Sequence, residues 1–192
     1  MLTEGIGDAE CVKRVQRGDT DFFEVLVRRH QKAIFNLVYR LLGDYDEAAE
    51  AAQEVFLSAY KSIGQFRGEA NFSTWLYRIG LNHASTRRKS LNSMHQRHIP
   101  LDNTEVIADS AVDPAKNVEY KEIQQRVQQA LNSLDPEDAR IILLRDLQDV
   151  TYEEVAEMLD IPVGTVKSRL HRARQALKTI LAPYFHANRK AS

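Results

Sequence analysis

Apolar residues recur at every third or fourth position along most of the chain, and the strict alternation of apolar and polar residues that marks a half-buried strand is missing. This spacing places apolar side chains on one face of a helix. We therefore predict an all-α protein. The expected helices lie near residues 8–17, 20–42, 45–63, 71–90, 115–133, 136–147, 152–159 and 163–182.

A segment without helical periodicity separates the expected helices into two groups. Between Leu91 and Pro114 the chain is rich in Ser, Asn, Asp and Pro, which is typical of a linker. The length of 192 residues suits two small domains. We expect these at residues 8–90 and 115–185, joined by a flexible linker over residues 91–114.

The second expected domain contains the pattern of a helix-turn-helix. Thr151 and Glu154 have the spacing of a capping box, so a helix should begin at Tyr152. Pro162 biases the residue before it away from helical geometry and should end that helix. Apolar residues at helical spacing resume at Val166. Two short helices joined by a tight turn form the helix-turn-helix motif. DNA-binding proteins with this motif place its second helix in the major groove.

Charge is segregated along the chain, although the net charge is only -1. From Ile161 to Ser192 every charged residue is basic, whereas the segment from Asp135 to Asp160 is strongly acidic. An amphipathic helical pair with a solvated basic face is the alternative interpretation. The segregation favours DNA, because a random surface mixes both signs.

The first expected domain is also polarised. Acidic residues alone occupy Asp44 to Glu54, and basic residues alone occupy Ala70 to Leu101. We interpret the first segment as a surface for a basic partner and the second as one for nucleic acid. Aromatic residues lie close to arginines between the two segments, which suits single-stranded DNA, although the spacing of Phe72 and Trp75 fits a core stripe equally well.

Other classes of function find little support. A single cysteine cannot form an internal disulfide, and neither a leader pattern nor a stretch of about 20 apolar residues is present, so we expect a cytoplasmic protein without membrane insertion. The chain lacks a glycine-rich phosphate loop, and we predict no enzymatic activity, catalytic residue or cofactor. A transcriptional regulator with an N-terminal receiver or ligand-binding domain should show strands or a cofactor pocket there, and the first ninety residues show neither pattern. His95 and His98 have the spacing of metal ligands, but a solvated or phosphate-contacting role in the linker is the stronger interpretation, and we predict no metal site.

Two segments carry a specific family resemblance. QEVFLSAYKSIGQFRGEANFSTWLYRIGLNHA and YEEVAEMLDIPVGTVKSRLHRAR resemble bacterial sigma factors of the extracytoplasmic-function (ECF) subgroup, sigma-E-like. The match covers roughly Glu10 to Ser90 and Val118 to Pro183. It implies a protein that binds RNA polymerase core and directs promoter-specific initiation, reading the minus-ten element with its first domain and the minus-thirty-five element with its second.

The resemblance also implies partners and site residues. The core contacts are the clamp helices of the largest subunit and the flap, a linker path through polymerase channels is expected, and an anti-sigma factor would control a stress or extracytoplasmic regulon. Core-polymerase binding is implied for Glu50, Gln53 and Glu54. Minus-ten contacts are implied for Ser62, Phe66, Arg67, Trp75, Arg78 and Asn82. Minus-thirty-five contacts are implied for Arg145, Thr165, Lys167, Ser168, Arg169, His171 and Arg172. Ala51, Ala52 and His171 depart from the residues common in the family.

Overall fold

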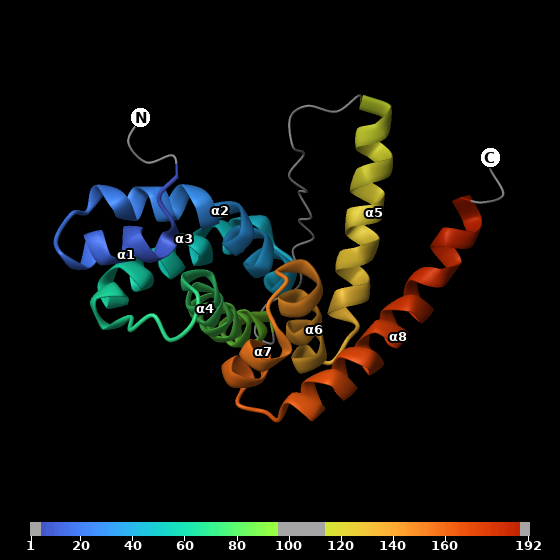
Figure 1. Cartoon of the computed structure of the whole chain (residues 1–192). Helices are drawn as coiled ribbons and strands as arrows, with labels where there is room; N and C mark the ends of the chain where they lie inside the picture. Colours follow the sequence, from blue (N-terminus) through green and yellow to red (C-terminus); the bar gives the residue numbers. More distant parts are fainter. Residues whose placement is uncertain (1–4, 96–113, 189–192) are drawn as a thin grey trace. The chain divides into compact units, whose positions relative to one another are not determined.

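The structure, a computed structural model, describes residues 5–95 and 114–188, and every regular element in these ranges is helical (Figure 1). The predicted all-α class is confirmed. Helices α1, α2 and α4 with nearly all of α3 form one compact unit, and α5 to α8 form a second. In the described ranges, no helix combines the length and apolar character needed to cross a membrane.

The first unit is built on α2 (Asp21–Leu42), which packs against α1 (Asp8–Gln16) and α4 (Phe72–His95). Helix α3 (Tyr45–Ser62) continues into a short 3-10 turn, η1 (Ile63–Gln65). The predicted apolar faces meet in one core because each helix turns the same periodic stripe inward. Fully buried members of this core are Leu26, Ile34, Leu37, Val55 and Leu76.

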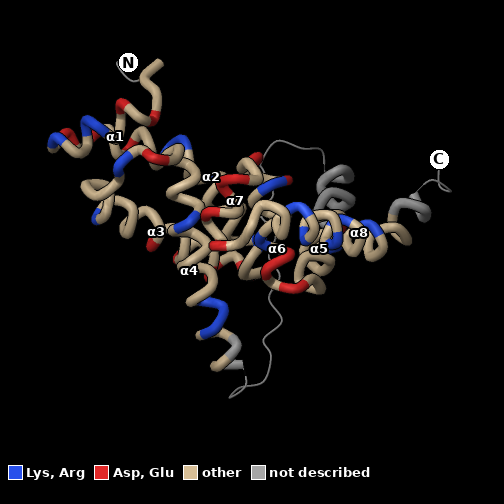
Figure 2. The backbone as a smooth tube through the Cα atoms, turned by 60° about the horizontal axis from the view of Figure 1, so that its bottom comes forward, with Lys and Arg blue, Asp and Glu red and all other residues tan. Residues whose placement is uncertain are grey.

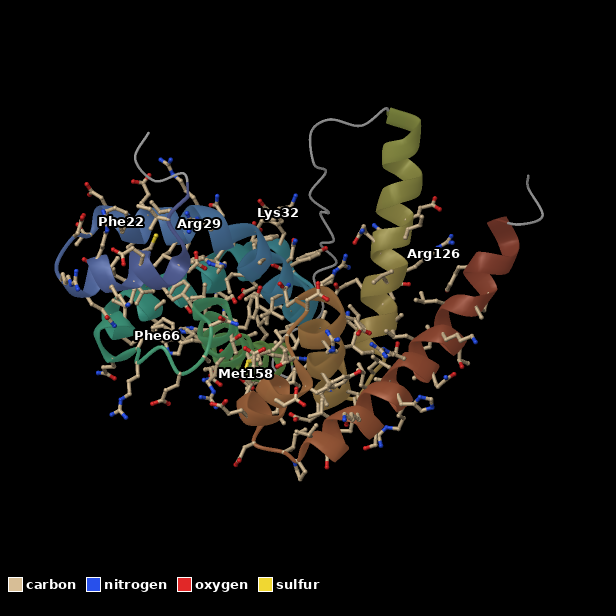
Figure 3. All side chains as sticks on the ribbon, in the orientation of Figure 1. Phe22, Arg29, Lys32, Phe66, Arg126 and Met158 are labelled. Atoms are coloured by element: carbon tan, nitrogen blue, oxygen red, sulfur yellow. The ribbon has the colours of Figure 1, made fainter. Side chains whose placement is uncertain are left out.

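Helix α1 holds two other parts of this unit in place. The Gln16 side-chain amide donates to the carbonyl oxygens of Ile63, at 2.8 Å, and Phe66, at 2.9 Å, and so fixes the loop before α4. At the other end of α1, the carboxylate of Asp8 lies 2.9 Å from Arg29 and 2.6 Å from His30 of α2. Figure 3 shows Arg29 on the side of α2 that faces α1. The loop that carries Phe66 is therefore anchored by side chains from outside it.

In the second unit, α6 (Pro136–Ile142) and α7 (Tyr152–Leu159) pack against the long helix α8 (Val163–Asn188). Helix α5 (Pro114–Asn132) also contacts α8. A π-helical turn, η2 (Leu143–Leu147), follows α6. The core of this unit includes Ile141, Leu144, Val155, Val166 and Leu170, all of which are 2% exposed or less.

Both ends of α7 are closed by local hydrogen bonds. At its start the predicted capping box is confirmed: the amide of Glu154 donates to Thr151 Oγ1 at 3.2 Å, and the amide of Thr151 donates to the Glu154 carboxylate at 3.1 Å. At its end Asp160 adopts a left-handed conformation with φ 52°. The amides of Asp160 and Ile161 then donate back to the carbonyls of Glu157 and Ala156, which is the Schellman arrangement. The turn of the helix-turn-helix is therefore made by Asp160, just before the Pro162 that predicted it.

Several boundaries differ from the prediction. Helix α4 runs to His95, into the segment predicted as linker, and the expected helix 136–147 changes to a π-helical turn after Ile142. Residues 96–113, which include His98 and most of the predicted linker, lie outside the described residues. Helix α8 continues through Pro183 to Asn188 instead of ending near 182. Proline removes one helical hydrogen bond. At the next residue, the ring centre of Tyr184 lies 4.5 Å from the guanidinium of Arg126 on α5, and Figure 3 labels Arg126.

The left-handed Asp160 predicts a sharp sequence preference in the turn. Asp160→Val should destabilise the second unit by about 1–2 kcal/mol, because a β-branched side chain is strained at this φ, whereas Asp160→Gly should be neutral or better. Circular dichroism during urea unfolding of the full chain measures the effect. The sole tryptophan, Trp75, lies in the first unit, so its fluorescence transition should stay in place as an internal control. Equal midpoints for the valine and glycine variants would contradict the role of Asp160.

Candidate nucleic-acid and protein interfaces

The second helix of the helix-turn-helix, α8, has an inward face and an outward face. Val166, Leu170 and Ala173 are buried, whereas Lys167, Ser168 and His171 are exposed. Figure 2 shows Lys and Arg along α8, and the described part of this helix contains no acidic residue. The exposed residues are spaced at i, i+1 and i+4, so they form one outward strip on the first turns of the helix. This strip has the charge and the position of a surface that enters the major groove.

Other predicted groove residues lie beside this strip. Thr165 is half-buried and its carbonyl accepts a hydrogen bond from Ser168 Oγ at 3.0 Å. Arg169 is half-buried and lies 3.8 Å from Glu137 of α6. Both residues belong to the same turns of α8 as the exposed strip, but they are less exposed than its members, and the Arg169 side chain is paired with Glu137.

Arg172 has a different role from the one that sequence reasoning gave it. Its guanidinium donates hydrogen bonds to both carboxylate oxygens of Asp138, at 2.9 to 3.0 Å. Asp138 lies on α6 and is only 5% exposed, so its charge needs this partner. The geometry favours Arg172 as the residue that positions α8 on α6, in place of a direct reader of a base edge.

A further residue, Tyr152, was missed by sequence reasoning. Its ring contacts two predicted DNA-contacting cations, with its centre 5.0 Å from the Arg145 guanidinium and 5.5 Å from Lys167 Nζ. Arg145 Nε is buried without a hydrogen-bond partner, so the ring face supports this side chain from one side. The signal in the sequence was an aromatic residue at the first position of α7, which periodicity alone does not distinguish from core.

In the first unit, the aromatic residues form a cluster at the start of α4. The Phe66 ring centre lies 5.1 Å from that of Trp75 and 6.0 Å from that of Phe72. Phe72 is buried, whereas Phe66 and Trp75 are half-buried and form the outer part of the cluster. Figure 3 shows Phe66 on the loop that precedes α4. Burial therefore separates the two interpretations of these residues. Phe72 belongs to the core, whereas Phe66 and Trp75 are partly accessible to a ligand.

The remaining predicted minus-ten residues differ in their exposure and in their hydrogen bonds. Arg67, Arg78 and Asn82 are exposed. Ser62 is half-buried, and its hydroxyl donates to the carbonyl of Ser58 at 2.6 Å. Asn82 makes none of the side-chain hydrogen bonds seen in the described part of the chain, so its amide is available to a ligand.

The acidic helix α3 carries Glu50, Gln53 and Glu54 on its exposed face. The sequence segment that carries these acids contains no base, but in the fold Arg87 of α4 forms ion pairs with Glu50 and with Glu54. Arg87 also pairs with Glu47. The hydrogen bonds that its guanidinium donates to Glu47 and to Glu50, in that order of importance, raise the pKa of Arg87 above its ordinary value. Arg87 is therefore not one of the bases that α4 offers freely to nucleic acid.

Fold and surfaces together define a DNA-binding protein of two helical units, one of which presents a helix-turn-helix. Two family models match it: Sigma-70 region 2 over residues 26–93 and Sigma-70, region 4 over residues 124–177. The RNA polymerase sigma-H factor of Pseudomonas aeruginosa is 39% identical, over 95% of this chain and 97% of the relative. The ECF RNA polymerase sigma-E factor of Escherichia coli K12 is 37% identical, over 95% of this chain and 98% of the relative. The chain belongs to the extracytoplasmic-function family of sigma factors.

A solved structure agrees with this fold. CnrH, in complex with the cytosolic domain of CnrY, superimposes with a TM-score of 0.69 at 22% identity and covers 92% of this chain and 97% of that chain. As a member of its family, the chain is a transcription initiation factor that binds RNA polymerase core and directs it to promoters.

The ion pair between Arg172 and Asp138 generates a prediction that separates positioning from base reading. Arg172→Ala leaves a buried carboxylate without its partner, so it should destabilise the second unit by about 1–3 kcal/mol. Adding Asp138→Asn should recover part of this loss, because the unpaired charge is removed. Lys178→Ala, an exposed change on the same helix, should be neutral. Urea unfolding followed by circular dichroism measures all of them. Unchanged stability of Arg172→Ala, together with relaxed base preference, would assign Arg172 to the DNA.

Proposed function

We propose that the two units divide promoter recognition, the second reading the minus-thirty-five element through the exposed strip Lys167, Ser168 and His171. The observation that carries this assignment is the strip itself, which lies on the first turns of the second helix of a helix-turn-helix and has no acidic neighbour on α8. Lys167 supplies a phosphate or base contact, whereas the shorter Ser168 hydroxyl suits a base edge. Arg145 and Tyr152 support the Lys167 side of this strip.

The first unit is proposed to open the promoter at the minus-ten element. A flipped base needs a stacking surface and a polar group for its edge, because unstacking it costs about a few kcal/mol. The outer rings of the aromatic cluster, Phe66 and Trp75, supply the first, and the exposed amide of Asn82 supplies the second. Exposed Arg67 and Arg78 supply positive charge for the backbone of the unpaired strand.

Helix α3 is proposed to dock on the clamp helices of the polymerase through Glu50, Gln53 and Glu54. All of them are exposed on successive turns of α3, and the small side chains of Ala51 and Ala52 are buried beneath them. The alanines therefore shape the packing of α3 on its own unit and leave the exposed face to the partner. Acidic charge on that face complements a basic surface.

Control by an anti-sigma factor, with a stress or extracytoplasmic regulon as its target, completes the proposal. Of the solved structures of similar fold, CnrH is bound to the cytosolic domain of CnrY, and the sigma factor RpoE from Bartonella quintana is bound to the anti-sigma factor NepR. We expect a protein antagonist of this kind to cover the polymerase-binding face.

Charge reversal on α3 tests the docking surface. Glu50→Lys with Glu54→Lys should weaken assembly with core polymerase by about tenfold or more, because it places like charges against a basic surface. Fluorescence anisotropy of the labelled full chain, titrated with core, measures the affinity. Asp19→Lys with Glu24→Lys makes the same change of charge at exposed positions outside α3 and should have little effect. Equal affinities of the two double variants would contradict the docking assignment.

Removal of a single amide tests the minus-ten assignment. Asn82→Ala should leave the closed promoter complex intact and reduce strand opening by about tenfold, because one base-edge contact contributes about 1–3 kcal/mol. Permanganate footprinting of the holoenzyme on promoter DNA separates the two steps. Asn36→Ala removes an equally exposed amide from α2 and is the matched control. Phe66→Ala should share the opening defect; normal opening by both variants would leave the aromatic cluster with a packing role only.

A further inference from the structure

Arg87 lies where the two functional helices of the first unit meet. From α4 it reaches across to α3, and its guanidinium pairs with the carboxylates of Glu47, Glu50 and Glu54. The weakest of these contacts joins Nη1 to Glu54 Oε1 at 3.4 Å. These acids lie on successive turns of α3 and face α4 in one row. One guanidinium therefore serves a row of carboxylates that includes both acids assigned to polymerase docking.

The partners of Arg87 differ in exposure. The Glu47 side chain is 28% exposed, whereas those of Glu54 and Glu50 are 49% and 67% exposed. Glu47 is thus the inner anchor of Arg87, and the other two carboxylates are open to solvent on their far side. His83 adds a second contact from α4, with Nδ1 3.4 Å from Glu54 Oε2 and Nε2 2.9 Å from Ser58 Oγ.

We propose that Arg87 is an internal competitor for RNA polymerase, holding the carboxylates of Glu50 and Glu54 that a basic polymerase surface would bind. The proposal rests on the docking assignment made above. Assembly would then exchange an intramolecular cation for one from the polymerase, with Arg87 retained on Glu47. The chain would thereby bind core less tightly than its acidic face alone allows.

The charge balance of the cluster supports competition. Three carboxylates and one guanidinium give a charge of 1 − 3 = −2 where the acids alone would give −3. The remaining negative charge still attracts a basic partner, but the field that steers it is reduced. Exposed ion pairs are individually weak, so the outer contacts to Glu50 and Glu54 are the ones that a partner displaces most easily. The structure thus attenuates docking without blocking it.

Neutralising Arg87 in the full chain tests the proposal directly. Arg87→Gln should bind core polymerase about three- to tenfold more tightly at low salt, because the acids gain negative field and lose a competing donor. The affinity should also fall more steeply as salt is raised. Arg88→Gln removes the same charge one position along α4 without removing any of these ion pairs, so its gain should be clearly smaller. Arg87→Lys keeps the positive charge but loses the forked N–H donors of the guanidinium, so its gain in affinity for core should be smaller than that of Arg87→Gln. Thermal unfolding checks that each variant is folded.

A double-mutant comparison separates this inference from the docking assignment. In a Glu50→Gln, Glu54→Gln background, Arg87→Gln should give no gain, since the contested carboxylates are gone. If reversing Glu50 and Glu54 does not weaken assembly, the docking assignment itself fails. If reversal weakens assembly while Arg87→Gln binds core equally or less tightly than the unmodified chain, docking stands and the competitor role is overturned, because Arg87 then orients the acids for the polymerase.

Discussion

A buried carboxylate on α6 is bound by an arginine of α8. Asp138 is almost inaccessible to water, and the guanidinium of Arg172 satisfies both of its oxygens. Because the pair spans two helices, it constrains the rotation of α8 as well as its position. In this orientation Val166 and Leu170 are buried, and the outward strip that begins at Lys167 faces away from the core. The ion pair between α8 and α6 therefore helps to fix the direction in which the surface proposed to read DNA points.

The first unit also pairs an arginine of one helix with acids of another, but there the acids outnumber the arginine. There one arginine, Arg87, meets several acids that remain partly exposed, so the cluster keeps a negative surplus. A buried carboxylate such as that of Asp138 fixes geometry, because removing its partner leaves an unsatisfied charge. An exposed cluster is open to exchange because each contact is weak. The same residue types thus hold a helix in the second unit and leave a docking surface available in the first.

Local signals in the sequence predicted the helices and the helix-turn-helix well. The capping box at Thr151 and Glu154 acts within one turn, and it appears as predicted. Contacts between distant residues were not predictable: Arg172 and Arg87 have the same charge in the sequence as any solvated base, and only packing of the helices reveals the acids that they bind. The continuation of α8 past Pro183 was not predicted either, because proline usually ends or kinks a helix. The family resemblance identified candidate residues, but it did not show which of them were already engaged.

As a sigma factor, this chain confers promoter specificity on RNA polymerase. In vitro transcription of genomic fragments by core polymerase, with and without the purified chain, tests it most directly. We expect defined start sites that depend on the chain and share a pair of upstream elements, at the spacing that two separate recognition units require. Transcription that is the same with and without the chain, under conditions in which the chain is folded and bound to core, would contradict it.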